Sequence, residues 1–496
     1  MRSSDTHAAI AAHRFGLGES SLNAIGGDAP GWLLQQLGPA PPQTGVGLVS
    51  GAEGIRRFAQ FIASQRLNPA AIGSAQTGAS MGASTGASMG AGIGGTAASD
   101  TRSTEQQFGE HFRAIVQADL RARLSTAALS TRPFTERLAL FWANHFTVSM
   151  AKASARGLVG AFEREAIRPN MAGNFEQLLK AAVQHAGMLR YLDNDHSAGP
   201  DSAIVLRLAR RQRADAQAPP RLTGLNENLA REILELHTVG ATGGYSQADV
   251  TAFAQVLTGW RVPLQRLLAQ PADAQGVQPV QFDAAWHQPG DKVVLGRRYA
   301  EGPQALDQVL HDLAAHPATA RFVSTKLVRH LVADDPPPAL VARLEASFLA
   351  TGGDLPSLYR SLVQSPEAWA PQQAKLKTPE EFVISTVRVL NLGEQAFARQ
   401  ADGAVNQMGQ RVQAAPSPAG WPDRAEEWLG PDAVWKRLEW ATRVAGLVGR
   451  QADARALARA SLGPLLQDDT LRQIERAADG PQALTLMLMA PEFQRR

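Results

Sequence analysis

The sequence predicts a mainly α-helical protein, a multi-helix globular array of one or two subdomains with irregular or disordered insertions. Two observations support this prediction. Apolar residues recur every three to four positions through most of the chain, the spacing that places them on one face of a helix. Strand-like patterning is confined to short runs such as Lys292–Leu295. Because so few residues could form a sheet, helices must build the core.

The helices are predicted in order from their apolar stripes. Leu225, Leu229, Ile233 and Leu236 recur at i, i+4, i+8 and i+11, which predicts a helix that ends near Gly240. A second helix is expected to start at residue 246, where a serine is followed three positions later by an aspartate. Similar periodicity predicts helices over residues 135–147, 174–192, 305–313, 317–332, 338–349, 354–364 and 378–392.

The 496-residue chain is longer than the roughly 250–300 residues at which a single core stops growing, so subdivision is expected. We predict an N-terminal helical part over residues 1–69, a main helical part over 104–450 and C-terminal helices over 451–496. Between the first two lies a Gly/Ala/Ser-rich insertion, residues 70–103, with no charge until Asp100. Its side chains are too small to offset the entropy of ordering, which predicts disorder.

Two further irregular insertions are predicted within the main part, near residues 195–223 and 264–283. The first is rich in arginine and is bounded by Gly-Pro and Pro-Pro pairs. It is interpreted as a solvated loop or short surface helix, with a docking patch for an acidic partner as the alternative. Its arginines are Arg207, Arg210, Arg211, Arg213 and Arg221.

Composition excludes several classes of function. Lysine and arginine number 49 against 46 acidic residues, and the net charge of +3 is too small to require nucleic acid. The chain has no cysteine, which removes disulfides, thiolate metal sites and cysteine nucleophiles. The first thirty residues lack the apolar core of a signal peptide, and no stretch approaches the roughly 20 apolar residues of a membrane span. The absence of a signal predicts a cytoplasmic protein.

No nucleotide cofactor is expected. Gly90, Gly92 and Gly95 match the dinucleotide-binding spacing, and Ser80, Ser84 and Ser88 each lie in a G-x-S-x-G context. All of these matches fall inside the Gly/Ala/Ser-rich insertion, where no strand precedes them as either motif requires. Walker A and H-E-x-x-H patterns are absent from the sequence.

The densest group of polar residues lies in the segment 226–237. On a helix Asn228, Glu232 and Glu235 share one polar stripe, and His237 follows at its end. The stripe has two interpretations. It is an exposed ion-pair ladder that includes Arg231, or it is buried, in which case its carboxylates need a cation, a metal or a shared proton.

His145 offers a complement to these carboxylates, because it lies in the strongly aromatic segment 141–147. Together Glu232, Glu235, His145 and His237 are the candidate catalytic residues, around a divalent metal or as general acid and base. The repeated Glu-x-x-His pair of helical metal sites is missing, however. A structural polar network with a hydrogen-bonded core histidine is therefore the competing interpretation.

Several motifs resemble the bacterial family known as domain of unknown function 1800. They occur in order along most of the chain, and the run over 226–240 with Gly-Gly-Tyr at 243–245 is the most specific. The others are Arg-Phe-Gly-Leu-Gly at 14–18, Phe-Trp-Ala-Asn-His-Phe-Thr at 141–147, Arg-Glu-Ala-Ile-Arg-Pro-Asn at 164–170, Tyr-Leu-Asp-Asn at 191–194, Leu-Thr-Gly-Trp at 257–260 and Gly-Trp-Pro-Asp at 420–423.

The resemblance implies a partner but supplies no catalytic residues. Genes of this family often neighbour one for a domain of unknown function 1501 protein, which is sulfatase-like and commonly carries a twin-arginine signal. The favoured hypothesis is a helical accessory or scaffold protein acting with that partner. The alternative is an enzyme with the carboxylate and histidine site described above. Co-export with the partner would place the chain in the periplasm instead of the cytoplasm.

Overall fold

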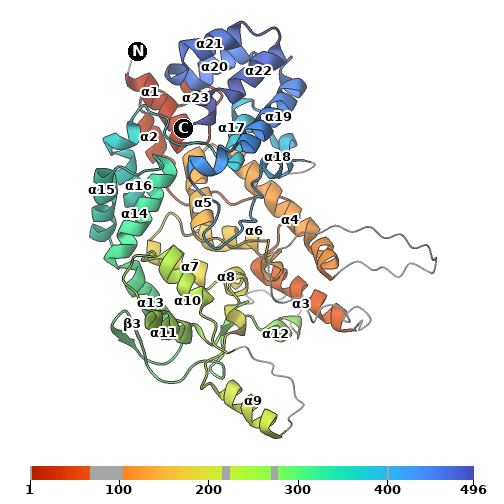
Figure 1. Cartoon of the computed structure of the whole chain (residues 1–496), viewed down its shortest axis with the longest axis vertical. Coiled ribbons are helices and arrows are strands. Elements are labelled where there is room, and N and C mark those ends of the chain that lie inside the picture. Colours follow the sequence, from red (N-terminus) through yellow and green to blue (C-terminus); the bar gives the residue numbers. More distant parts are fainter. Residues whose placement is uncertain (1–2, 68–103, 215–223, 270–277, 399–401) are drawn as a thin grey trace, which may run out of the picture.

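The computed structural model describes residues 3–67, 104–214, 224–269, 278–398 and 402–496. The predicted Gly/Ala/Ser-rich insertion at 70–103 lies outside the described residues. The rest is a mainly helical assembly with two small antiparallel strand pairs, so the predicted fold class is confirmed (Figure 1). No helix within the described ranges is both long and apolar enough to span a bilayer.

Residues 3–269 contain twelve of the described α-helices. They are α1 (Ser3–Ile10), α2 (Ala29–Leu34), α3 (Gly51–Leu67), α4 (Thr104–Leu129), α5 (Pro133–His145), α6 (Val159–Phe162), α7 (Phe175–Val183), α8 (Ala186–Tyr191), α9 (Ala203–Ala214), α10 (Asn228–Glu232), α11 (Gln247–Leu257) and α12 (Leu264–Ala269). The helix α9 occupies part of the Arg-rich insertion, and most of its described side chains are exposed or half-buried, in line with the surface-helix interpretation.

Residues 278–496 continue with helices and contain three of the four strands. Its helices are α13 (Gln304–Ala314), α14 (Pro317–Leu331), α15 (Pro338–Ala350), α16 (Leu355–Val363), α17 (Pro379–Val389), α18 (Gly403–Gln407), α19 (Pro431–Val448), α20 (Ala454–Leu462), α21 (Asp468–Glu475), α22 (Gly480–Met489) and α23 (Pro491–Gln494). The antiparallel strand pairs are β1 (Trp260–Arg261) with β2 (Gln281–Phe282), and β3 (Lys292–Val294) with β4 (Arg297–Tyr299).

Most predicted helices form within a few residues of their expected bounds. Ser246 and Asp249 make the reciprocal capping box that starts α11, and α13 to α17 match the predicted segments. The stripe over 174–192 is the exception, because it is divided between α7 and α8. His185 lies at the division, where its ring accepts a hydrogen bond from the backbone N–H of Gly187 and caps α8.

One continuous core joins the two ends of the chain. Its buried apolar residues run from Ala8 to Phe493, and Figure 1 shows α1 beside the C-terminal helices. The His13 ring lies 2.8 Å from the carbonyl oxygen of Ser461 in α20. A smaller cluster packs α3 against α4, and its buried residues are four phenylalanines and one isoleucine: Phe58, Phe61, Phe108, Phe112 and Ile115.

Three segments of π-helix directly follow the ends of α1, α6 and α10 within the described residues, at η1 (Ala11–Phe15), η5 (Glu163–Ile167) and η7 (Ile233–His237). Each overlaps one of the motifs at 14–18, 164–170 and 226–240. A π turn closes i to i+5 bonds and is wider than an α turn, so it changes which side chains share a face. Within η7 it alters the direction of Glu235 and His237 relative to the α-helix assumed from the sequence.

Candidate functional site

Two motifs from distant parts of the chain fit together at the C-terminal end of α5. The Asn144 side chain donates to the carbonyl oxygen of Trp421 at 3.0 Å and accepts from its backbone N–H at 2.8 Å. Gly420 has φ of +85°, and a Cβ there would lie 2.6 Å from the Asn144 backbone oxygen. The irregular segment 409–424, blue in Figure 1, is therefore fixed beside α5.

This junction places an aspartate against a histidine of α14. Asp423 Oδ2 lies 3.2 Å from His330 Nδ1, whereas His330 Nε2 is buried and has no hydrogen-bond partner within the described residues. Burial lowers the pKa of His330, although Asp423 opposes this shift. Burial opposes ionisation of Asp423, but His330, Lys375 and Arg496 outweigh it and bring the pKa of that carboxyl to about 2. A neutral imidazole beside an ionised carboxylate is thus favoured at neutral pH.

A buried lysine holds the aspartate in place. Lys375 Nζ lies 3.4 Å from Asp423 Oδ1 and also donates to the backbone oxygen of Asp423 and to Asp334. On the other side, Trp428 Nε1 donates to the carbonyl oxygen of Pro422 at 3.1 Å. The aspartate is therefore oriented by contacts to both its side chain and its backbone.

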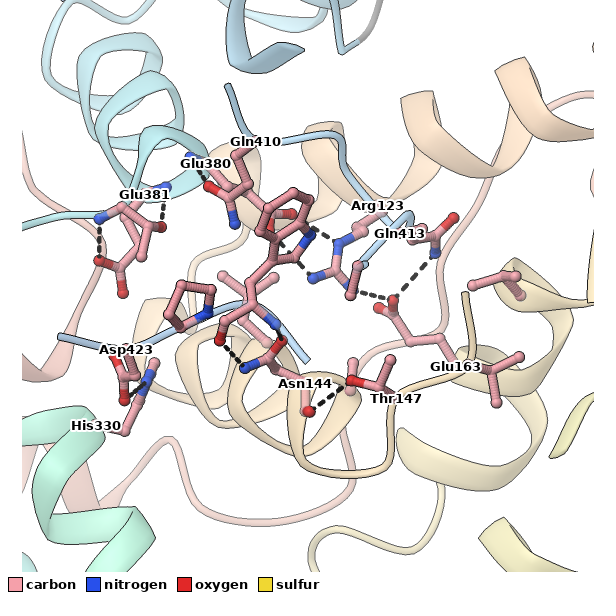
Figure 2. A pocket seen from close by; sticks show the side chains of 18 of the residues that line it. Arg123, Asn144, Thr147, Glu163, His330, Glu380, Glu381, Gln410, Gln413 and Asp423 are labelled. Carbon is pink, nitrogen blue, oxygen red and sulfur yellow. Dashed lines mark hydrogen bonds and ion pairs between the residues drawn. The ribbon is translucent and has the colours of Figure 1, made fainter. Parts of the chain in front are cut away.

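Beyond the pair lies a small acidic chamber with a cavity volume of about 70 Å³. Arg123 crosses it, contacting Glu163 on one side and Glu380 at 2.8 Å on the other. These two carboxylates raise the pKa of the Arg123 guanidinium although burial opposes them. Figure 2 shows Asp423 and His330 facing each other on one side of this chamber and Arg123 with Glu163 on the other.

The start of α17 also lines the acidic chamber. Glu381 completes the capping box of α17 with Thr378. Its carboxylate is bound by Arg496 at 3.0 Å and also contacts Arg137, and both arginine side chains have an exposed fraction of 0%. Burial opposes ionisation of Glu381, but the two guanidiniums hold the pKa of Glu381 well below its usual value. This group is a dry ion-pair network that fixes the position of the chamber wall.

A second chamber, the basic chamber, opens on the other face of Asp423, with a cavity volume of about 260 Å³. Its lining cations are Lys326 and Arg329 of α14 and Arg424, while Asp423 and Glu427 are its acidic residues. Lys326 forms no hydrogen bond or ion pair with any described residue. Burial lowers the pKa of Lys326 to about 8. Asp423 and His330 line both chambers.

Two of the four residues predicted from the sequence lie side by side at the basic chamber: His145 lines it, and His237 lies behind His145. His145 Nε2 lies 3.2 Å from the carbonyl oxygen of His237, and the two rings are 6.2 Å apart. Both rings are buried. His145 Nδ1 and both ring nitrogens of His237 have no partner among the described residues. Burial lowers the pKa of His237 to about 3, and that of His145 falls well below its usual value; Lys326 adds to both shifts.

The two predicted carboxylates lie elsewhere on the same polar segment. Glu232 and Glu235 are half-buried, and Tyr245 donates to Glu235 at 3.5 Å. Burial and the nearby Glu235 raise the pKa of Glu232. No hydrogen bond or ion pair in the described part of the chain joins either carboxylate to His145 or His237. Nor do the described residues contain a group of three or more His, Asp or Glu side chains arranged to hold a metal.

The sequence prediction missed His330, Lys326 and Arg329 as site residues. A signal for them exists, because α14 spans Pro317–Leu331 and contains three cationic residues and a terminal histidine with no acidic residue. Lys326, Arg329 and His330 stand at i, i+3 and i+4, and so share one face. Asp423 belonged to a recognised motif, but its histidine partner lies 93 positions away and no local pattern connects the two.

The fold and the site define a mainly helical protein with a charged cleft between α5, α14 and the segment 409–424. The family profile described as "Protein of unknown function (DUF1800)" matches residues 10–495. The chain therefore belongs to the DUF1800 family, which confirms the resemblance drawn from the motifs. No curated protein and no solved structure shows significant similarity to the chain.

Proposed function

We propose that the protein is an enzyme that uses His330 as a general base, oriented by Asp423. The single observation behind this proposal is that only one of the two ring nitrogens of His330 is engaged by the protein. Asp423 engages His330 Nδ1 at 3.2 Å, while Nε2 is left without a partner in the described residues. A carboxylate on one ring nitrogen fixes the tautomer, so the other nitrogen carries the lone pair that can take a proton.

The charges around the pair suit this role at neutral pH. The pKa of Asp423, about 2, keeps its carboxylate ionised, and the lowered pKa of His330 keeps the imidazole neutral and able to accept a proton. The His330 side chain has an exposed fraction of 12% and its Nε2 is closed to solvent. A substrate therefore reaches Nε2 through a rearrangement of the cleft lining, after which bulk water is excluded.

The reaction class can be tested with chromogenic esters of acetate, phosphate and sulfate and with aryl glycosides. We expect turnover of at least one class, reduced at least about a hundredfold in kcat/KM by His330→Gln and by Asp423→Asn. The matched control is His311→Gln, because His311 lies on α13 with an exposed fraction of 62%. Turnover that persists in both cleft variants would remove the assignment.

The protonation state can be tested without a substrate. Long-range proton–nitrogen NMR correlations of histidine-labelled protein, with His330→Gln to assign the signal, report the tautomer of His330. We expect a neutral ring protonated on Nδ1 at pH 7, and Asp423→Asn is expected to change the tautomer balance. A ring that is charged at pH 7, or protonated on Nε2, contradicts the proposed base.

An accessory role beside a domain of unknown function 1501 protein is the second candidate. It is supported by large apolar side chains that α19 presents to solvent, with exposed fractions of 60% for Trp435 and 77% for Leu447. Such side chains often mark a protein interface. Co-expression of the two proteins tests it: we expect co-purification, lost in Trp435→Ser with Leu447→Ser, and co-export to the periplasm. A well-expressed partner that never associates contradicts this role.

A further inference from the structure

The basic chamber is lined by three cationic and two acidic side chains, and two of the cations form no ion pair with a carboxylate of the described residues. Lys326 and Arg329 lie one turn apart on α14 and both line the chamber. Arg329 Nε donates to the backbone oxygen of Asp334 at 3.3 Å, and neither residue has a carboxylate partner within the described residues. The acidic chamber differs, because Arg123 there is bound by Glu163 and Glu380.

Asp423, one of the two acidic residues of the lining, attracts Lys326 electrostatically but is already bound by other groups. Asp423 contacts His330 and Lys375. Arg424, which adds a third cation to the lining, contacts the side chain of Asp335 at 3.5 Å, and Asp335 has an exposed fraction of 93%. Glu427, the second acidic residue of the lining, is exposed and forms no ion pair with either cation among the described residues, so Lys326 and Arg329 remain available to an incoming anion. The packing that half-buries Lys326 also strengthens any ion pair it forms with a ligand.

Unpartnered ring nitrogens behind the chamber add a second, independent observation. His145 lines the chamber, and its Nδ1 is buried without a partner. His237, directly behind it, leaves both ring nitrogens unpartnered and has an exposed fraction of 0%. Buried polar atoms are usually hydrogen-bonded, and a buried group left alone calls for an unseen partner. A ligand with several oxygen atoms, together with the waters it brings, would supply such partners.

We propose that the basic chamber binds an oxyanion of the substrate, a carboxylate, phosphate or sulfate group, through Lys326 and Arg329. Ammonium and guanidinium groups are the side chains that recognise such anions by charge-assisted hydrogen bonds. The cavity volume of about 260 Å³ leaves room for a small organic group attached to the anion. This inference rests on the proposed function, because Asp423 and His330 line the same chamber, and it places the anion beside the base.

Calorimetric titration of the full chain with phosphate, sulfate and acetate, at constant ionic strength set by chloride, tests the inference directly. We expect saturable binding of at least one of these anions, and the one that binds best identifies the substrate group. Lys326→Met is expected to weaken binding about tenfold to a hundredfold, as loss of one charge-assisted contact does. The matched control, Lys436→Met on α19, removes a lysine that is 39% exposed and should leave binding unchanged.

Arg329→Gln is the second variant, used if Lys326→Met unfolds by circular dichroism. Absence of binding by all three anions overturns the inference, as does binding that neither variant weakens. These outcomes are separable from failure of the proposed function. The tautomer of His330 is measured without added anion, and turnover of the acetate esters and aryl glycosides needs no oxyanion on the substrate, so both results can hold when anion binding fails.

Discussion

The two most polar regions of the molecule differ in how they are assembled. The segment 226–237 draws its charged side chains from one stretch of chain, and Glu232 and Glu235 are only half-buried. The cleft around Asp423 draws His330, Lys375 and Glu381 from separate segments. Apart from the cations of the basic chamber, its charges are mutually neutralised at short range, because single buried charges are unfavourable. The conspicuous local cluster is thus only half-buried, whereas the denser charge network is assembled by the fold from distant segments.

The largest expected effect lies in this network. Glu381→Gln would leave Arg137 and Arg496, both with side-chain exposed fractions of 0%, without their carboxylate. Removing one partner of a buried ion pair typically lowers the free energy of unfolding by about 3–5 kcal/mol. Urea denaturation followed by circular dichroism measures the change. A loss below about 1 kcal/mol is typical of exposed ion pairs and would show that the network is solvated. The cleft around Asp423 would then not differ from the segment 226–237 in the burial of its charges.

Buried neutral histidines predict the pH dependence of stability. Burial lowers the pKa of His13 and of His237 to about 3, below the value of about 6.5 in an unfolded chain. Between these values the unfolded state binds more protons, so the free energy of unfolding falls as pH decreases from about 6.5 toward 3. Each histidine contributes a slope of about 1.4 kcal/mol per pH unit.

Urea denaturation at pH 7, 6 and 5 measures this slope. His237→Asn should remove the contribution of one histidine to the slope, about 1.4 kcal/mol per pH unit. His311→Gln, at an exposed position, should leave the slope unchanged. Asp119, whose pKa burial raises to about 6, contributes a slope of opposite sign, so the test is the difference between the wild type and His237→Asn. Equal slopes in these two proteins would mean that His237 is accessible to protons, contrary to the closed packing at the basic chamber.

The junction of the two motifs is tested by Gly420→Ala. A Cβ at Gly420 would lie 2.6 Å from the Asn144 backbone oxygen and from its side-chain oxygen, and the φ of +85° adds strain. We expect the free energy of unfolding to fall by about 2–3 kcal/mol, more than the roughly 1–2 kcal/mol of left-handed strain alone. Gly409→Ala is the control, because its φ is +91° and a Cβ there meets nothing within 4 Å. Equal losses in both variants would contradict a close fit at Asn144.

How far the sequence predicts the molecule depends on the range of the interactions. Helices such as α14 and α17 are set by periodicity and caps within a few residues, and their bounds were predicted closely. The break at His185 and the π turn in η7 depend on local hydrogen bonds that the apolar pattern does not encode. His145 and His237 were both named as candidates, but the contact between the His145 ring and the His237 carbonyl oxygen was not predicted. The pairing of Asp423 with His330 depends on the packing of α14, the segment 409–424 and α5, which no local spacing records.

The smallest expected effect lies in the segment 226–237. Burial and the nearby Glu235 raise the pKa of Glu232, so its ionised form is disfavoured in the folded state, and stability decreases as pH rises through its titration. Glu232→Gln removes that charge and should leave the free energy of unfolding at pH 7 unchanged or slightly higher, within about 0.5 kcal/mol. Metal analysis of the purified protein before and after this substitution completes the test. A large loss of stability together with loss of stoichiometric metal would move the functional assignment from the cleft to Glu232 and Glu235.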